Sequence, residues 1–104
     1  MKYLEVEMSD GSVWRVPAGI IACHRAGYYA AREKCEADPY AKIFAEELDF
    51  TMSNAHELID WAKNNMKWKY VSEFATMHKP ANANIFHESW ANAPMQVIQE
   101  VPND

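Results

Sequence analysis

The chain lacks the many cysteines of disulfide-rich secreted proteins and the long apolar runs of membrane proteins. It contains only two cysteines and three glycines, and it has no apolar run long enough to cross a membrane. Two cysteines fit a reducing compartment, and the N-terminal residues lack the apolar segment of a signal peptide. We therefore expect a protein that stays in the cytoplasm and has no membrane partner.

The two cysteines, Cys23 and Cys35, do not form a recognisable site. Along one continuous helix their separation is about 18 Å, whereas a disulfide needs Cα atoms within about 7 Å. We expect both thiols to be buried as small apolar residues. No cysteine or histidine has a partner at metal-ligand spacing, so the sequence predicts no metal and no cofactor.

Positive charge is also scarce. Ten Lys and Arg stand against 15 Asp and Glu, which gives a net charge of −5, and the basic residues are scattered. Binding to nucleic-acid phosphates needs a basic stripe, so we do not expect a nucleic-acid partner. One acidic alternative stays open, a protein that mimics nucleic acid. It requires Glu5, Glu7, Glu46, Glu47 and Asp49 to line up on one face.

Composition and length predict one α+β domain over residues 1–104. Hydrophobic residues make up 49% of the chain, and apolar positions continue from Tyr3 to Val101 without a linker. The chain is too short for a Rossmann enzyme or a TIM barrel. It is long enough to bury about two thirds of its unfolded surface in one core.

The first residues predict a β-hairpin. A three-residue Ser9-Asp10-Gly11 loop with Gly11 in the left-handed conformation pairs Val6 with Trp14 and Leu4 with Val16. A two-residue turn would instead mix charged and apolar side chains on one face, so we favour the first register. The four paired residues should form the floor for the helix that follows.

The centre of the chain is predicted to be helical. We expect helices over residues 18–36, 40–48, 55–66 and 68–78, with Asn54 and Glu57 as a capping box. A strand over residues 95–102 should pair with the hairpin. The result is a small antiparallel sheet covered on one face by three to four helices. The core stripe predicted for the first helix is Ile20, Ile21, His24, Gly27, Tyr28, Ala31 and Cys35.

One polar cluster is a candidate ligand-binding site. His24, Tyr28 and Arg32 lie at i, i+4 and i+8 of the first helix, so they share one face. A histidine, a tyrosine and an arginine together suit a small anion or acid–base chemistry. The alternative is a solvated helix margin on which these groups reach water or a neighbouring carboxylate.

Aromatic residues are abundant, whereas catalytic motifs are absent. Four Trp, five Tyr and four Phe make up 12% of the chain, more than we expect a core of this size to use. Exposed Trp and Tyr are typical anchors of protein interfaces. The sequence therefore favours a non-enzymatic protein–protein interaction module or homo-oligomer that uses exposed aromatic residues of the segment 61–70 or the segment 84–94. The alternative is a small-ligand binder or enzyme at the cluster above. The candidate interface residues are Tyr29, Tyr40, Trp61, Trp68, Tyr70 and Trp90.

Two blocks of sequence carry a resemblance. Residues 10–17 (DGSVWRVP), together with 20–22 (IIA) and 24–30 (HRAGYYA), resemble the opening of short uncharacterised proteins of tailed phages, and residues 60–68 (DWAKNNMKW) resemble a second block of the same proteins. The resemblance implies no activity and no catalytic residue. It implies a phage gene product that acts in the cytoplasm of an infected cell and binds a host or phage protein.

Overall fold

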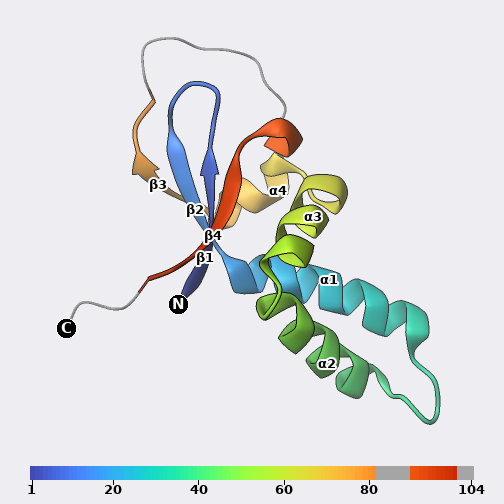
Figure 1. Ribbon diagram of the computed structural model, residues 1–104. Coiled ribbons are helices and arrows are strands. Elements are labelled where there is room, and N and C mark those ends of the chain that lie inside the picture. Colours follow the sequence, from blue (N-terminus) through green and yellow to red (C-terminus); the bar gives the residue numbers. More distant parts are fainter. Residues whose placement is uncertain (82–89, 101–104) are drawn as a thin grey trace.

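An antiparallel β-sheet forms one layer of the protein, and helices cover one of its faces (Figure 1). The computed structural model describes residues 1–81 and 90–100. Within them the strand order is β3-β2-β1-β4. The strands are β1 (Lys2–Glu7), β2 (Val13–Pro17), β3 (Thr76–Lys79) and β4 (Met95–Gln99). The predicted α+β class is thus confirmed.

The β1–β2 hairpin has the predicted register. Leu4 pairs with Val16 and Val6 pairs with Trp14. Gly11 has a φ of 86°, a left-handed conformation that glycine adopts without a steric penalty. The amide of Gly11 donates to the carbonyl of Met8 at 2.9 Å, which closes the turn. This turn fixes which side chains of both strands face the helices.

Polar groups on the open face of the sheet support the same register. Glu5 lies opposite Arg15, whose Nε donates to Glu5 Oε2 at 3.1 Å. On the other side, Gln96 Nε2 donates to Glu5 Oε1 at 2.8 Å. These bonds, the one from Gln96 first, hold the pKa of Glu5 below its ordinary value.

Strand β4 confirms the predicted pairing with the hairpin, since Leu4 of β1 lies opposite Val97. Strand β3 was not predicted. We expected a helix over residues 68–78, but the helix ends at Val71, and residues 76–79 pair with β2. The physical reason is non-local, because the open edge of β2 offers backbone hydrogen bonds that no local helical pattern reveals.

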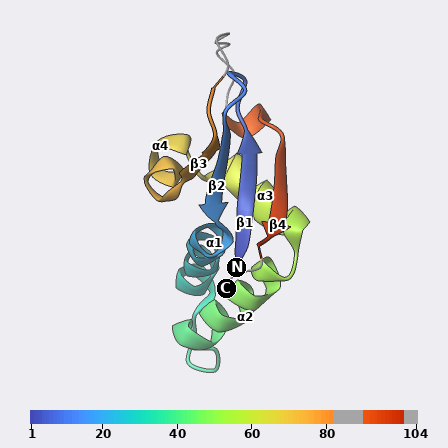
Figure 2. The ribbon, with the colours of Figure 1, turned by 90° about the vertical axis from the view of Figure 1, so that its left-hand side faces the viewer.

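The helices fall into two groups (Figures 1 and 2). Helices α3 and α4 lie against the sheet. Helices α1 and α2 pack side by side, antiparallel, and extend past the end of the strands as the α1–α2 arm. The arm explains a radius of gyration of 15.3 Å, above the value of about 13 Å for a compact chain of this length. The helices are α1 (Ala18–Glu33), α2 (Tyr40–Met52), α3 (Ala55–Asn65) and α4 (Trp68–Val71), with short 3₁₀ turns at Ser72–Phe74 and Trp90–Asn92.

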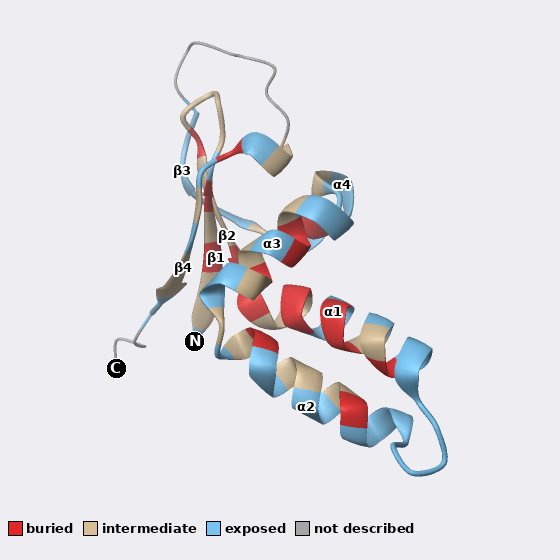
Figure 3. Cartoon of the chain, turned by 45° about the vertical axis from the view of Figure 1, so that its right-hand side comes forward, coloured by how far each residue is buried: buried red, intermediate tan, exposed pale blue. Residues whose placement is uncertain are grey.

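Helix α1 buries a different face from the predicted one (Figure 3). The prediction was right for Ile21 but wrong for His24, Tyr28, Ala31 and Cys35, which are exposed. Both cysteines are exposed, so their predicted burial is wrong too. Small side chains at four-residue spacing allow close approach of α2, and the larger ones remain at the margin. The buried residues of α1 are Ala18, Ile21, Ala22, Arg25, Ala26 and Ala30.

Local signals set the start of α3 but not the end of α2. The Asn54 side chain accepts from the amide of Glu57 at 3.2 Å, which confirms the predicted N-cap. Residues 49–53 were predicted as a loop, but α2 continues to Met52. Thr51 is completely buried there, and its hydroxyl donates to the carbonyl of Glu47 at 2.7 Å.

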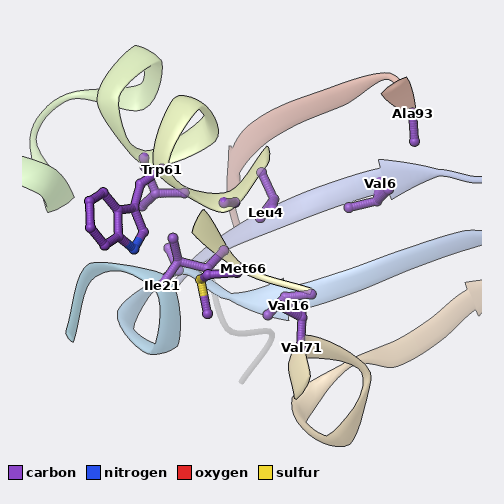
Figure 4. Packing of buried hydrophobic residues seen from close by; sticks show 11 residues of the cluster. Leu4, Val6, Val16, Ile21, Trp61, Met66, Val71 and Ala93 are labelled. Carbon is purple, nitrogen blue, oxygen red and sulfur yellow. The ribbon is translucent and has the colours of Figure 1, made fainter. Parts of the chain in front are cut away.

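The core lies between the sheet and the helices (Figure 4). The sheet contributes Leu4, Val6 and Val16, none of which is accessible to solvent. Trp14, the fourth predicted floor residue, is half-buried and packs edge-on against Trp68, with 5.6 Å between ring centroids. Only the first turns of α1 rest on this floor. The other core residues are Ala18, Ile21, Leu58, Trp61, Ala62, Met66, Val71 and Ala93.

Candidate functional site

A cleft opens between α1 and α3, at the root of the α1–α2 arm. Its volume is about 400 Å³, and we call it the α1–α3 cleft. The structure brings all three predicted ligand-binding residues, His24, Tyr28 and Arg32, to its α1 wall, because α1 turns this face away from α2. The same wall includes Arg25 and Tyr29. The opposite wall consists of Glu57, Asp60, Trp61 and Asn65.

Trp61 connects the two walls. Its indole Nε1 donates to Nδ1 of His24 at 2.9 Å, and Trp61 itself is only 7% exposed. Because Nδ1 must offer a lone pair, a neutral His24 carries its proton on Nε2. No described residue bonds to that Nε2. The N–H of His24 is therefore a donor open to a ligand or to water.

Ring contacts extend from the cleft onto the neighbouring surface, over α1, α3 and α4. Tyr28 lies 5.4 Å from Trp61 and 5.3 Å from Tyr29, measured between ring centroids. On the other side, His24 lies 5.9 Å from Tyr70, and Tyr70 lies 5.6 Å from Phe74. We call this continuous series the aromatic band. Its members are Tyr29, Tyr28, Trp61, His24, Tyr70 and Phe74.

Arg25 has a structural role at the base of the cleft. It is 8% exposed, and its Nη1 donates to Glu47 at 2.7 Å and to Thr51 at 3.1 Å. Its Nη2 lies 3.9 Å from Glu57, and its guanidinium lies 4.7 Å from the centre of the Tyr29 ring. Arg25 thus joins α1 to both α2 and α3, and its charge is already compensated.

Two charges of the cleft lack a partner of opposite sign among the described residues. Nη1 of Arg32 donates to the neutral hydroxyl of Tyr28 at 3.1 Å and makes no ion pair. On the facing wall, Oδ1 of Asp60 accepts from the neutral amide of Asn64 at 2.9 Å. The cleft therefore presents an unpaired positive charge on α1 and an unpaired negative charge on α3.

The predicted interface residues fall into three environments. Tyr70 and Tyr40 are 46% and 44% exposed. Tyr29, Trp68 and Trp90 are half-buried. Trp61 is buried in the core, so its expected exposure as an interface anchor is wrong. The reason is that α3 packs between α1 and the sheet. Segment 84–94 lies partly outside the described residues.

Sequence reasoning missed residues on both the cleft and the surface. Glu57, Asp60 and Asn65 face α1 only because of how α3 packs, and no motif marks them as cleft residues. Phe50, Phe74 and Met77, which the sequence did not mark as surface residues, are 40–49% exposed. Phe50 was missed because residues 49–53 were predicted as a loop, whereas Phe50 lies on α2.

The acidic alternative receives no support from the arrangement of the carboxylates. Glu5 lies on β1, where it is paired with Arg15. Glu46, Glu47 and Asp49 lie on α2, and Glu47 is paired with Arg25. These side chains belong to different layers and do not form one row of unpaired charges.

Residues 1–81 and 90–100 contain no group of three His, Cys, Asp or Glu side chains placed to hold a metal ion. None of the helices within these ranges combines the length and apolarity required to cross a bilayer.

Comparison with known proteins identified no relative of this chain. No family model matches the chain, and no match was found among curated proteins or solved structures.

Proposed function

We propose that the protein is a non-enzymatic protein–protein interaction module that binds its partner along the aromatic band. One observation carries the proposal: exposed aromatic side chains from two helices and a 3₁₀ turn form one continuous series of ring contacts, and Tyr28 of this series lines the cleft. Tyr28, Tyr70 and Phe74 are 48%, 46% and 40% exposed, and each belongs to the same series of ring contacts.

The physical basis is the energetics of interfaces. A tyrosine offers a large apolar area and a polar hydroxyl, and it loses little rotamer entropy on binding. Binding hot spots are enriched in tyrosine, tryptophan and arginine and cluster around pockets. The aromatic band contains three tyrosines and Trp61, and Arg32 lines the same cleft as Tyr28 and Trp61.

The partner is either a second copy of this chain or a different protein. The resemblance to phage proteins supports a host or phage protein in the cytoplasm of an infected cell. A dimer in which the aromatic bands of two copies face each other is the other form of the proposal. The two are separated by the mass of the isolated protein in size-exclusion chromatography with light scattering.

The test is site-specific photo-crosslinking. We would place a photoreactive phenylalanine analogue at Tyr28 or Tyr70 and, as a matched control, at Tyr3 on the open face of the sheet. Support is a discrete crosslinked product at the first two positions that is absent at Tyr3 and is lost when Phe74 is changed to Ala. Equal crosslinking at all three positions, or none at any, contradicts the proposal.

A second candidate function is a small-ligand binder or acid–base enzyme centred on His24, Tyr28 and Arg32. The observation in its favour is that these three side chains line one cleft of about 400 Å³, within the size range of ligand pockets. This candidate requires the cleft to bind a small molecule in the absence of any protein partner.

A further inference from the structure

The α1–α3 cleft has opposite unpaired charges on its two walls and aromatic rings between them. A ligand with one charge satisfies one wall and leaves the other unpaired. We propose that the cleft binds a group that carries a carboxylate and an ammonium on an aromatic frame, such as an aromatic amino acid or an equivalent set of peptide side chains. The inference rests on the proposed function, because it specifies the chemistry recognised in the same cleft.

The carboxylate belongs at the α1 wall. Nη1 of Arg32 donates to Tyr28 Oη at 3.1 Å, which leaves the phenolic proton of Tyr28 free to donate elsewhere. The other N–H groups of the guanidinium have no partner among the described residues. A guanidinium fork beside a hydroxyl donor matches the two oxygens of a carboxylate.

The ammonium belongs at the α3 wall. Asn64 occupies only Oδ1 of Asp60, and Oδ2 makes no hydrogen bond with a described residue. An ammonium that pairs with Oδ2 also lies in a cleft with aromatic walls, where ring faces attract cations. Glu57 does not compete for the ammonium, because Arg25 already lies 3.9 Å from its carboxylate.

The aromatic ring of such a ligand has protein rings to pack on beside the two charged side chains. Tyr28 and Trp61 lie 5.4 Å apart with their planes inclined at 50°, which leaves ring surface facing the cleft. An additional ring can pack on these surfaces in an offset or edge-on arrangement. A volume of about 400 Å³ holds a molecule of amino-acid size.

The experiment follows the indole N–H of Trp61 by NMR in the intact protein. The probes are L-phenylalanine, 3-phenylpropionate, which lacks the ammonium, and phenethylamine, which lacks the carboxylate. We expect L-phenylalanine to shift the Trp61 signal and to bind about fivefold more tightly than either analogue, as one exposed ion pair allows. No shift with L-phenylalanine, or equal affinities for all three probes, overturns the proposal.

Charge variants assign each end of the ligand. Arg32→Gln should make L-phenylalanine bind no better than phenethylamine, and Asp60→Asn should make it bind no better than 3-phenylpropionate. Lys34→Gln and Asp49→Asn each remove one charge of the same sign from an exposed position outside the cleft. Both control variants should still bind L-phenylalanine more tightly than either analogue. If the control variants lose this difference in affinity as fully as Arg32→Gln and Asp60→Asn do, the assignment of the ligand to the cleft is wrong.

Two peptides distinguish the source of the ligand. Acetyl-Glu-Phe-Lys-amide presents both charges within a chain, and acetyl-Gln-Phe-Gln-amide presents neither. Preference for the charged peptide over L-phenylalanine identifies a protein segment as the ligand, and the reverse identifies a free amino acid. Crosslinking at Tyr28 without binding of any charged probe would remove this inference and retain the interaction module. Probe binding without crosslinking would support the charged ligand and contradict the aromatic band as a protein interface.

Discussion

The indole N–H of Trp61 donates to Nδ1 of His24 at 2.9 Å, and this bond joins α3 to the exposed face of α1. Trp61 is therefore both a core residue and part of the wall of a surface cleft. Packing from the sheet side and a hydrogen bond from the cleft side hold its ring in one orientation. The position of the cleft is thus set by the core beneath it.

Replacing Trp61 separates its two roles. Trp61→Phe keeps an aromatic ring but removes the hydrogen bond, and we expect the free energy of unfolding to fall by about 1–2 kcal/mol. Trp61→Ala should cost about 3–5 kcal/mol, because it also leaves a cavity. Urea denaturation measures both changes. An unchanged midpoint for Trp61→Phe would show that the hydrogen bond adds nothing to stability.

Two arginines on α1 should differ in their effect on stability. Arg25→Ala leaves Glu47 without its partner in a half-buried position, and we expect a loss of about 2–3 kcal/mol. Arg32→Ala is the matched control, since it is exposed and bonds only to Tyr28, and its effect should stay within about 0.5 kcal/mol. Similar losses in the two variants would contradict the structural role of Arg25.

Two glycines offer a similar comparison. Gly11→Ala forces a side chain into a left-handed conformation, with φ of 86°, and should cost about 1–2 kcal/mol. Gly19→Ala adds a methyl group that meets no atom within 4 Å apart from its chain neighbours and the backbone of its own helix. It should stabilise α1 by about 0.5–1 kcal/mol. Thermal melting measures both shifts, and a stabilising Gly11→Ala would disprove the turn conformation.

We expect acid to lower the free energy of unfolding through two carboxylates of the hairpin. The hydroxyl and amide of Ser12 hold the pKa of Asp10 below its ordinary value of 3.8, and bonds from Gln96 and Arg15 hold that of Glu5 below 4.5. A lowered folded-state pKa means that the unfolded chain takes up protons first. The stabilising effect is therefore fully present above about pH 4.5 and is lost as the pH falls through the lowered pKa values.

The measurement is urea denaturation between pH 6 and pH 3, where stability should decline with decreasing pH. Glu5→Gln should remove part of this decline. Glu7→Gln is the control on the same strand, because its side chain makes no hydrogen bond or ion pair with the described residues. If Glu5→Gln and wild type lose stability in parallel over this range, the interactions of Glu5 are not the cause.

Local chemistry explains what the sequence predicted correctly. The hairpin register follows from the alternation around Leu4 and Val6 and from a turn that only Gly11 accommodates. The cap at Asn54 depends on residues three positions away. His24, Tyr28 and Arg32 share a face because of helical periodicity alone, so their common location in the cleft was also within reach of the sequence.

Long-range packing explains what the sequence did not predict. The buried face of α1 is chosen by α2, and small residues such as Ala26 leave no strong hydrophobic pattern for this choice. Strand β3 forms because β2 has an open edge, which the local sequence does not report. The α3 wall of the cleft, including Asp60, is set by where α3 docks between α1 and the sheet.

The length of the α1–α2 arm magnifies any change of angle at its root. Helix α1 is about 24 Å long from its 16 residues, and only its first turns rest on the sheet. A small change in the angle between α1 and α3 at the cleft is therefore magnified at the far end of the arm. Cys35 lies at that end, and once the exposed Cys23 is replaced, a spectroscopic label on the Cys35 thiol would report such a change.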